Sequence, residues 1–336
     1  MGFARAIGSA ATALFVLSAF GAVPAVAQQK IKVSFAAMSA NYSPYHIAIE
    51  KGYFREEGLE VEIVRAGGGT ATPALIAGDL AFSTSGSSAV NPIIRGASMK
   101  VMLVLFDRPT YQIWTTRDDV KALADLKGKS LGIQTRGDTF EIAARIVFKQ
   151  NGIDANTVGY SPLGFGSETR MAAIKTGSLH AVVLAALDAK QLKNAGLLDK
   201  GRMLADLYQT VRIPYTGSAT TDKMIKENPA QVKSYVRAVV KGMHYMRAFR
   251  DETVDITIPY NKAPRDVSLE EYDQVLQSMT EDGTVAEPTI RDDLEVRAGL
   301  LNISTDKLPP PDKVYDFSFV REVNKELAAS GWKPTR

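Results

Sequence analysis

The feature that most limits the possible folds is a regular alternation of strand-like and helix-like segments. Apolar and polar side chains alternate over residues 30–37 and 59–64, as in half-buried strands. Helix-forming segments at 44–54 and 70–77 follow these strands. Residues 99–106 are largely apolar, which is typical of a strand buried on both faces. Repeated strand–helix units of this kind predict a largely parallel sheet.

The same pattern returns later in the chain. Residues 54–60 (FREEGLE) are echoed by 148–154 (FKQNGID), and 75–80 (LIAGDL) are echoed by 174–179 (IKTGSL). Two echoes in the same order indicate a duplicated lobe, although any α/β protein can show a similar alternation. We therefore predict an α/β fold of two lobes, each a mostly parallel sheet flanked by helices.

The first residues have the composition of an export signal. Arg5 supplies a positive start, an apolar run covers about 7–23, and Ala25-Val26-Ala27 matches a cleavage site. A membrane anchor is the alternative, but the run is short and rich in Ala, Gly and Ser. We predict a signal peptide over 1–27, cleaved after Ala27, and a periplasmic mature protein without a membrane anchor.

Composition narrows the possible partners. The chain has no cysteine, so an exported form would depend on packing rather than on disulfides. Lys and Arg total 40 against 37 Asp and Glu, giving a net charge of +3. This balance contains no basic excess of the kind that binds nucleic acid or anionic membranes. We expect neither partner.

Small, uncharged residues cluster in the loops that follow the predicted strands. In an open parallel sheet, such loops lie at the carboxyl ends of the strands, where ligands bind. Glycines let backbone N–H groups approach a ligand, and hydroxyls and helix N-termini add polar contacts. Serine and threonine can also simply cap helices there. The loops together predict a cleft formed by residues 39–42, 67–70, 84–88, 135–139, 164–167 and 185–188.

Charged residues near these loops leave the charge of the ligand open. Arg108 and Arg136 could pair with a carboxylate or sulfonate, or each could be a surface arginine paired with Asp107 or Asp138. Asp138 and Asp188 stand at predicted helix starts, where a carboxylate stabilises the helix end. If either faces the cleft, it could instead accept hydrogen bonds from an amino group.

Aromatic residues could hold an apolar part of the ligand. Tyr42, Phe165 and Tyr215 are candidates to sandwich a ring, although core packing suits Phe165 better. The full set of predicted ligand-binding residues is Asn41, Tyr42, Gly69, Thr70, Ser85, Gly86, Ser87, Arg108, Thr135, Arg136, Asp138, Thr139, Phe165, Gly166, Asp188, Tyr215 and Gly217.

With these residues in place, the chain resembles the solute-binding proteins of ABC importers for nitrate, sulfonates, taurine and thiamin-pyrimidine precursors. The resemblance rests on the order KIKVSF, YSPYHIAIEKGYFREEGLEVEIV, GGG and LIAGDLAFSTSG, and it covers about residues 30–330. Residues 125–139 (DLKGKSLGIQTRGDT) are similar to the strand that opens the second lobe in this family. The resemblance implies a type II periplasmic binding protein, in which two crossing strands join the lobes and the ligand is trapped when the lobes close. It also implies a membrane permease and an ATPase as partners.

These expectations define the lobes. The chain would cross near 111–116 and return near 212–217. Lobe 1 is predicted to comprise 28–113 and 214–336, and lobe 2 to comprise 114–213. We expect the protein to be a monomer.

Two signals mark helices in the carboxyl-terminal part. Asn228 and Pro229 predict the start of a long helix that runs to about Arg250. The segment 268–271 (SLEE) predicts a capping box at the start of another.

Motifs for catalysis are weak in this sequence. Gly128-Lys129-Ser130 lacks the earlier glycine of a phosphate-binding loop, because Leu123 occupies its place. His46, His180 and His244 are far apart and show no metal-ligand spacing. An enzyme branch resembling this family uses a cysteine-rich motif, which the chain lacks. We predict a binding protein without catalytic residues, metal or cofactor.

The predicted function is a periplasmic receptor of an ABC importer that closes over one small organic solute. We expect a sulfonate or carboxylate, with or without an aromatic ring; the alternative ligand is a heterocycle such as a thiamin-pyrimidine precursor. A second alternative is an exported enzyme on the same fold, with Asp138, Asp188 or Glu168 as a base. A third is a sensory module that signals to a membrane kinase.

Overall fold

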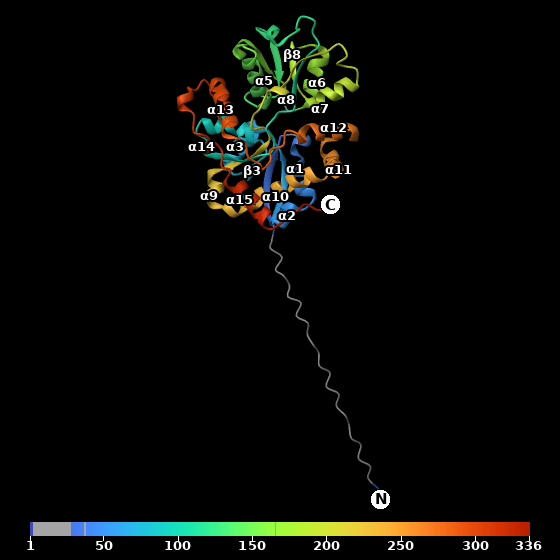
Figure 1. The fold of residues 1–336 in the computed structure, drawn as a ribbon, viewed down its shortest axis with the longest axis vertical. Coiled ribbons are helices and arrows are strands. Elements are labelled where there is room, and N and C mark those ends of the chain that lie inside the picture. Colours follow the sequence, from blue (N-terminus) through green and yellow to red (C-terminus); the bar gives the residue numbers. More distant parts are fainter. Residues whose placement is uncertain (3–27, 37, 165) are drawn as a thin grey trace.

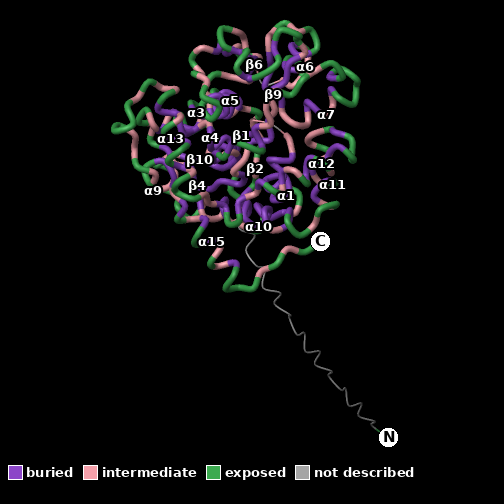
Figure 2. Tube along the Cα trace, turned by 45° about the horizontal axis from the view of Figure 1, so that its top comes forward, coloured by how far each residue is buried: buried purple, intermediate pink, exposed green. Residues whose placement is uncertain are grey.

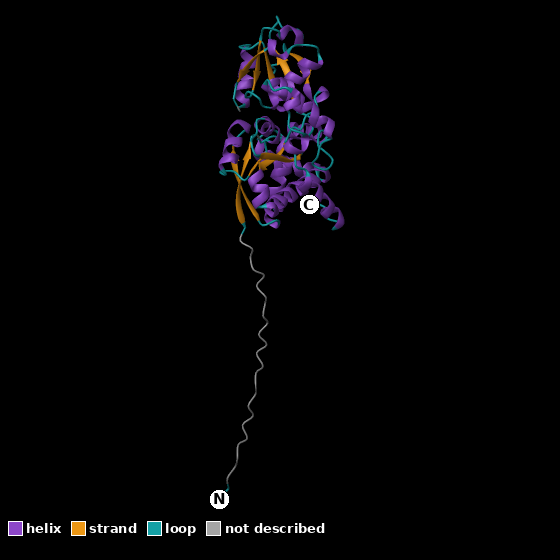
Figure 3. Cartoon of the chain, turned by 90° about the vertical axis from the view of Figure 1, so that its left-hand side faces the viewer, coloured by secondary structure: helices purple, strands orange, loops and turns teal. Residues whose placement is uncertain are grey.

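The computed structural model describes residues 1–2, 28–36, 38–164 and 166–336. The predicted signal peptide falls almost entirely on residues 3–27 and so lies outside the described residues. Figures 1 and 3 show two bodies, one above the other, each with a sheet flanked by helices. The predicted α/β fold of two lobes is confirmed.

The sheet of lobe 1 contains mostly parallel strands around a short central one. Its strands are β1 (Gln29–Phe35), β2 (Leu59–Arg65), β3 (Phe82–Ser83), β4 (Met99–Val104) and β10 (Gly217–Thr221), in the order β2-β1-β3-β10-β4. Strand β1 is parallel to β2 and β3, whereas β10 is antiparallel to β3 and β4. The helices between these strands are α1 (Ser43–Glu50), α2 (Tyr53–Glu56), α3 (Gly68–Ala77) and α4 (Gly86–Ile94), with a 3₁₀ turn, η1 (Ala40–Tyr42), before α1.

The sheet of lobe 2 repeats this arrangement. Its strands are β5 (Tyr111–Thr115), β6 (Ser130–Ile133), β7 (Gly159–Pro162), β8 (Ala181–Ala185) and β9 (Arg202–Asp206), in the order β7-β6-β8-β5-β9. Strand β6 is parallel to β7 and β8, and β5 is antiparallel to β8 and β9. The helices of this lobe are α5 (Thr139–Gln150), α6 (Ser167–Thr176), α7 (Ala186–Asn194) and α8 (Leu207–Thr210).

The chain passes from the first sheet to the second between Val104 and Tyr111, and it returns between Asp206 and Gly217. Strand β5 lies wholly within the second sheet. Residues 111–115 are therefore a strand of lobe 2, and the crossing segment, residues 105–110, lies earlier in the chain than the sequence predicted. The predicted boundary at 113/114 would fall inside β5, whereas the boundary at 213/214 stays a prediction.

The rest of the chain adds helices to lobe 1. These are α9 (Asp222–Glu227), α10 (Pro229–Ala248), α11 (Arg250–Asn261), α12 (Arg265–Leu276), α13 (Glu287–Leu301), α14 (Pro311–Val314) and α15 (Ser318–Ala329). The long helix α10 starts at Pro229 as predicted and packs against α1 and α15. The predicted capping box at Ser268 is wrong, because α12 already begins at Arg265 and Ser268 lies inside it.

Glycines end the equivalent helices of the two lobes. Gly78 after α3 (φ 84°) and Gly177 after α6 (φ 62°) adopt the left-handed conformation that favours glycine. Gly52 (φ 76°) divides the predicted helix 44–54 into α1 and α2. Figure 2 shows that the strands and inner helix faces are buried while the outer turns are exposed. Each lobe thus has its own core, and the loops at the strand ends are left to meet between them.

Candidate functional site

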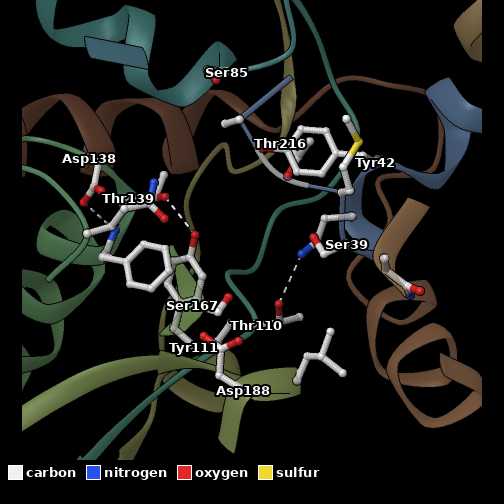
Figure 4. A pocket seen from close by; sticks show the side chains of 18 of the residues that line it. Ser39, Tyr42, Ser85, Thr110, Tyr111, Asp138, Thr139, Ser167, Asp188 and Thr216 are labelled. Atoms are coloured by element: carbon white, nitrogen blue, oxygen red, sulfur yellow. Dashed lines mark hydrogen bonds between the residues drawn. The ribbon is translucent and has the colours of Figure 1, made fainter. Parts of the chain in front are cut away.

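A cavity of about 660 Å³ lies between the lobes. Its wall is formed by loops at the carboxyl ends of β1, β3, β6 and β8, by the start of α6, and by residues of α11 and α12. Figure 4 shows Ser39 and Tyr42 of lobe 1 on one side and Asp138 and Thr139 of lobe 2 on the other. Cavities of this size commonly hold small organic ligands.

Buried polar atoms form part of the lobe 1 wall. Asn41, in η1, donates through Nδ2 to Thr110 Oγ1 (3.2 Å) and to Tyr215 Oη (3.4 Å). Asn41 Oδ1 and Ser85 Oγ are buried and have no hydrogen-bond partner among the residues that the structure describes. An unpaired buried polar atom costs free energy. Both residues line the cavity, so a hydrogen bond that a ligand brought to either atom would remove this cost.

Aromatic rings line the cavity near the segments where the chain crosses between the lobes. The rings of Tyr111 and Tyr215 meet edge to face, with centroids 5.4 Å apart, and Phe140 lies 4.0 Å from Tyr111. The hydroxyl groups of Tyr111 and Thr139 are 2.9 Å apart, which links β5 to the start of α5. Burial raises the pKa of Tyr111 well above its usual value, so its phenol stays neutral. This part of the wall offers apolar faces and uncharged hydroxyl groups.

Asp138 is the N-cap of α5. Its Oδ1 accepts hydrogen bonds from the backbone N–H groups of Phe140 (3.0 Å) and Glu141 (3.2 Å). Its Oδ2 accepts from the N–H (2.8 Å) and the hydroxyl (3.1 Å) of Thr135. Burial raises the pKa of Asp138 to about 6, although these hydrogen bonds act in the opposite direction. Both carboxylate oxygens are already occupied, so the residue mainly shapes the loop.

A buried ion pair lies in the lobe 2 wall. Arg170 Nη2 of α6 is 3.0 Å from Asp188 Oδ2 of α7, and both residues are only 3% exposed. The guanidinium group also lies over the ring of Phe140, 4.9 Å from its centroid. The two charges neutralise each other, since each has its partner at hydrogen-bond distance.

Glu271 of α12 brings a further carboxylate to the cavity wall. The side chain is buried, and its Oε1 accepts a hydrogen bond from the backbone N–H of Ala40 at 3.4 Å. Its Oε2 has no partner within the described part of the chain. Burial raises the pKa of Glu271 to about 7, and the nearby charge of Asp188 acts in the same direction. Near neutral pH this group therefore exists in both protonation states.

The structure brings many predicted site residues together around the cavity. Those that line it are Asn41, Tyr42, Ser85, Ser87, Thr135, Asp138, Thr139, Gly166, Asp188 and Tyr215. Phe165 lies outside the described residues.

The remaining predicted residues lie elsewhere. Thr70 turns its hydroxyl back to Gly67 O (3.1 Å) in the first turn of α3, and Gly69 faces a neighbouring hollow. The backbones of Gly86 and Gly217 are in close contact. A Cβ on Gly86 would lie only 2.9 Å from the carbonyl carbon of Gly217. These glycines serve close packing in lobe 1 rather than the cavity wall.

The two arginines expected to bind an anion do not line the cavity. Arg108 lies over the ring of Tyr208, with its Nε 3.8 Å from Asp107 Oδ1, in a separate hollow. Arg136 donates to Tyr160 O (2.7 Å) and lies 3.4 Å from Glu141. Local acceptors therefore hold the Arg136 guanidinium group, whereas Arg108 stacks on Tyr208 and its Nε has no hydrogen-bond partner within the described residues. Arg136 pairs with Glu141 rather than with Asp138, because Asp138 is used by the helix cap.

Sequence reasoning missed several residues of the wall, including Arg170 and Glu271. A signal for Glu271 exists, since Val267, Glu271 and Val275 are spaced four residues apart and share the buried face of α12. Arg170 likewise precedes Ile174 by one helical turn on the buried side of α6. A charged residue within an apolar helical stripe is thus the pattern that would have identified both.

The described part of the chain contains no cluster of histidine, cysteine or carboxylate side chains suited to hold a metal ion. His46 is buried between Phe35 and Tyr260, with its ring centroid 3.8 Å from that of Tyr260, and burial lowers its pKa to about 3.

None of the helices within the described ranges has the length and apolar character needed to cross a membrane.

The chain is similar to several known proteins in sequence or in fold. A riboflavin-binding protein, RibY of Chloroflexus aurantiacus, is 25% identical over 269 residues, covering 76% of this chain and 73% of that protein. Among solved structures, the nitrate-binding protein NrtA of Synechocystis matches with a TM-score of 0.74 and 16% identity, covering 92% of this chain and 91% of that one. The putative sulfonate-binding protein SsuA of Methylobacillus flagellatus matches with a TM-score of 0.69 and 17% identity, covering 92% and 98%. The desulfurization enzyme DSZB also shares the fold, with a TM-score of 0.62 and 13% identity, covering 89% and 99%.

These matches show that the chain has the fold of periplasmic solute-binding proteins of ABC importers. Residues 39–253, which make up more than half of the chain and include both halves of the duplicated pattern, match the family described as NMT1/THI5 like. The protein is therefore a member of the NMT1/THI5-like family.

Proposed function

We propose that this protein is the exported receptor of an ABC importer and that it captures one small organic solute between its lobes. The observation that carries this proposal is the cavity of about 660 Å³ lined by both lobes. Contacts from both walls exist together only when the lobes are close, so binding and closure are coupled. A permease and an ATPase would receive the closed form, and export through cleavage after Ala27 belongs to the same proposal.

The charge of the buried wall favours a neutral or amino-bearing heterocycle. Asp138, Asp188 and Glu271 contribute acidic groups, while Arg170 contributes a cation that is already paired. A ligand anion would meet a wall with net negative charge. The aromatic rings of the wall suit a flat ligand. The riboflavin-binding relative supports this ligand class, since riboflavin carries a flat heterocycle.

An organic anion is the second candidate. Arg65 and Lys262 also line the cavity and are exposed, so they could attract a sulfonate or carboxylate to its edge. The sulfonate-binding and nitrate-binding structural neighbours favour this class. The proposed heterocycle and the anion differ in one respect that binding can test, because only the anion needs an unpaired cation.

We propose that the protein binds without turnover. Asp138 has both oxygens occupied by the α5 cap, and Asp188 is paired with Arg170. Glu168 is exposed. Each of the three carboxylates predicted from the sequence as a candidate base is therefore hydrogen-bonded, ion-paired or exposed to solvent. The desulfurization enzyme on this fold makes turnover a necessary control.

A thermal-shift screen of residues 28–336 tests the proposal. The panel contains riboflavin, pyrimidines, aliphatic and aromatic sulfonates, aromatic carboxylates, nitrate and bicarbonate. A ligand present at one hundred times its Kd should stabilise the protein by about 2.7 kcal/mol. Calorimetry should then give one site, and the recovered ligand should be chemically unchanged. Stabilisation by anions alone would favour the second candidate, and a changed ligand would favour an enzyme.

A further inference from the structure

The cavity wall contains hydrogen-bond acceptors that the protein itself leaves unpaired. Glu271 is 7% exposed and Asn41 is 2% exposed, and both line the cavity. Glu271 Oε2 and Asn41 Oδ1 have no partner among the described residues. The backbone N–H of Ala40 donates to Glu271 Oε1, so Glu271 contacts the residue that directly precedes Asn41 in the chain. The unpaired acceptors therefore come from adjacent elements, η1 and α12.

An ionised carboxylate can only accept hydrogen bonds. The basic side chains of this region are used or solvated: Arg170 is paired with Asp188, Lys190 is 2.8 Å from the exposed Glu270, and Arg65 is exposed. Lys262 is exposed. Leaving a buried carboxylate oxygen unpaired is costly. The cost is relieved if the bound molecule supplies the missing donor.

From this arrangement we infer that Glu271 is the specificity residue of the cavity and selects ligands that carry an amino group on a flat ring. The inference rests on the proposed function and deepens it. Asn41 accepts a second N–H of the same donor edge, while the rings of Tyr111 and Tyr215 contact the flat face. The charge of Glu271 makes its hydrogen bond stronger than one between neutral groups. Burial raises the pKa of Glu271 to about 7, so its charge is disfavoured by the protein's own surroundings.

The test uses two probes of nearly equal size, 2-aminobenzimidazole and 2-methylbenzimidazole. Both have a ring N–H, but only the first has an amino donor. Calorimetry or ligand-observed NMR measures their affinities for residues 28–336. We expect the wild-type protein to bind the amino compound roughly tenfold more tightly, as for a hydrogen bond to a charged group.

Variants at adjacent positions of α12 isolate the carboxylate. Glu271→Gln keeps the size of the side chain and should reduce the preference to roughly threefold or less, because the charge is lost. Glu271→Leu should remove it. Glu270→Gln is the matched control for the preference, since Glu270 is exposed and pairs with Lys190. Loss of that pair between the lobes should lower the affinity for both probes alike and leave their ratio at the wild-type value. Circular dichroism and thermal unfolding confirm that each variant is folded.

The outcomes separate this inference from the proposed function. An equal preference for the amino compound in the wild-type protein and both Glu271 variants would overturn the inference, as would failure of the wild-type protein to bind either probe. The proposed function would survive both results if a member of the larger panel binds. Failure of every compound in that panel would instead contradict the proposed function.

Discussion

Lobe 1 and lobe 2 follow equivalent strand orders, β2-β1-β3-β10-β4 and β7-β6-β8-β5-β9, yet they line the cavity with different side chains. In lobe 1 the loops after β1 and β3 contribute buried uncharged groups, such as Asn41 and Ser85. In lobe 2 the helices that follow β6, β7 and β8 contribute buried charged groups, namely Asp138, Arg170 and Asp188.

The lobes also differ in the segments attached to the duplicated part. Lobe 1 receives α9 to α15, and α12 brings Glu271 to the cavity. The end of β2 contributes Arg65, whereas the loop after β7 leads into Gly166 and Ser167 of the wall. The duplicated scaffold thus decides where loops meet, while individual side chains and later helices decide the chemistry.

The largest expected effect tests whether both lobes depend on buried charge. Arg297 and Asp293 of α13 form an ion pair at 2.7 Å and are fully buried, like the Arg170–Asp188 pair of lobe 2. Arg297→Ala and Arg170→Ala should each lower the free energy of unfolding by about 3–5 kcal/mol, because each leaves a buried carboxylate unpaired. Urea denaturation measures the loss.

A matched control is present on the same helix. Arg291 pairs with Glu287 across one turn of α13, but both side chains are 60% exposed. Arg291→Ala should cost about 0.5 kcal/mol or less. If Arg297→Ala or Arg170→Ala cost no more than this control, the corresponding lobe would not depend on a buried charge, and the likeness between the lobes would not hold there.

The next effect concerns the acidic group that lobe 1 gains from α12. Burial raises the pKa of Glu271 from 4.5 to about 7, so the folded protein binds this proton more tightly than the unfolded chain. The stability of the wild-type protein should therefore fall as the pH rises from about 4.5 to about 7. Glu271→Gln removes this loss and should be more stable than wild type by up to about 3 kcal/mol at about pH 8.

Denaturation at several pH values measures this difference. The stability of the two proteins should converge at about pH 4, where the carboxyl group is protonated in both states. Asp138 is present in both proteins, so its titration largely cancels. A variant less stable than wild type at about pH 8 would mean that the Glu271 carboxylate has a partner in solution. The inferred role in ligand selection would then lose its basis.

The fold was predictable because local signals decide most of it. Gly78 and Gly177 end equivalent helices, and the apolar run of β4 identifies a buried strand. The position of the site was predictable because the loops that follow the central strands of each sheet meet at one place. Loop position located Asn41, Ser85 and other residues of the wall, but it wrongly extended the site to residues 67–70, where the hydroxyl group of Thr70 bonds within its own turn.

The remaining part of the site depends on contacts between distant residues. The hydrogen bond from Ala40 to Glu271 joins positions 231 apart, and no local pattern indicates it. Arg108 and Arg136 were assigned to the cavity from their loops, yet Asp107 and Glu141 hold them elsewhere. Side-chain direction is a tertiary property, so loop position alone predicts a site better than it predicts the charges that line it.

A smaller effect compares the two sheets. A Cβ on Gly217 of β10 would lie 2.2 Å from Leu103 O, whereas a Cβ on Gly132 of β6 would lie 2.9 Å from the side-chain ends of Leu163 and Leu179. Backbone in a sheet cannot move aside as side chains can. Within the range of about 1–3 kcal/mol for overpacking, Gly217→Ala should lie near the top and Gly132→Ala near the bottom. Thermal unfolding measures both, and the reverse order would mean that the β10–β4 pairing yields more easily than the core of lobe 2.

The smallest effect concerns the contact between the lobes at the mouth of a small hollow. Lys190 of α7 is 2.8 Å from Glu270 of α12, and the two side chains are 39% and 63% exposed. Lys190→Ala should therefore cost less than about 1 kcal/mol of stability. Because the pair joins the two lobes, its loss should shift the unliganded protein toward a more open form with a larger radius of gyration. Small-angle X-ray scattering measures that shift, which high salt should also produce in part in the wild-type protein by screening the pair.

Two control variants show whether charge attraction is responsible. The exchanged pair Lys190→Glu with Glu270→Lys should restore the wild-type radius of gyration. Lys193→Ala, on the same helix, should leave it unchanged because Lys193 lies over Trp114 within lobe 2. If the exchanged pair stays as open as Lys190→Ala, charge attraction is not what holds the lobes together here, and closure would depend on other contacts between them, such as the hydrogen bond from Asn91 of α4 to Gly137 O.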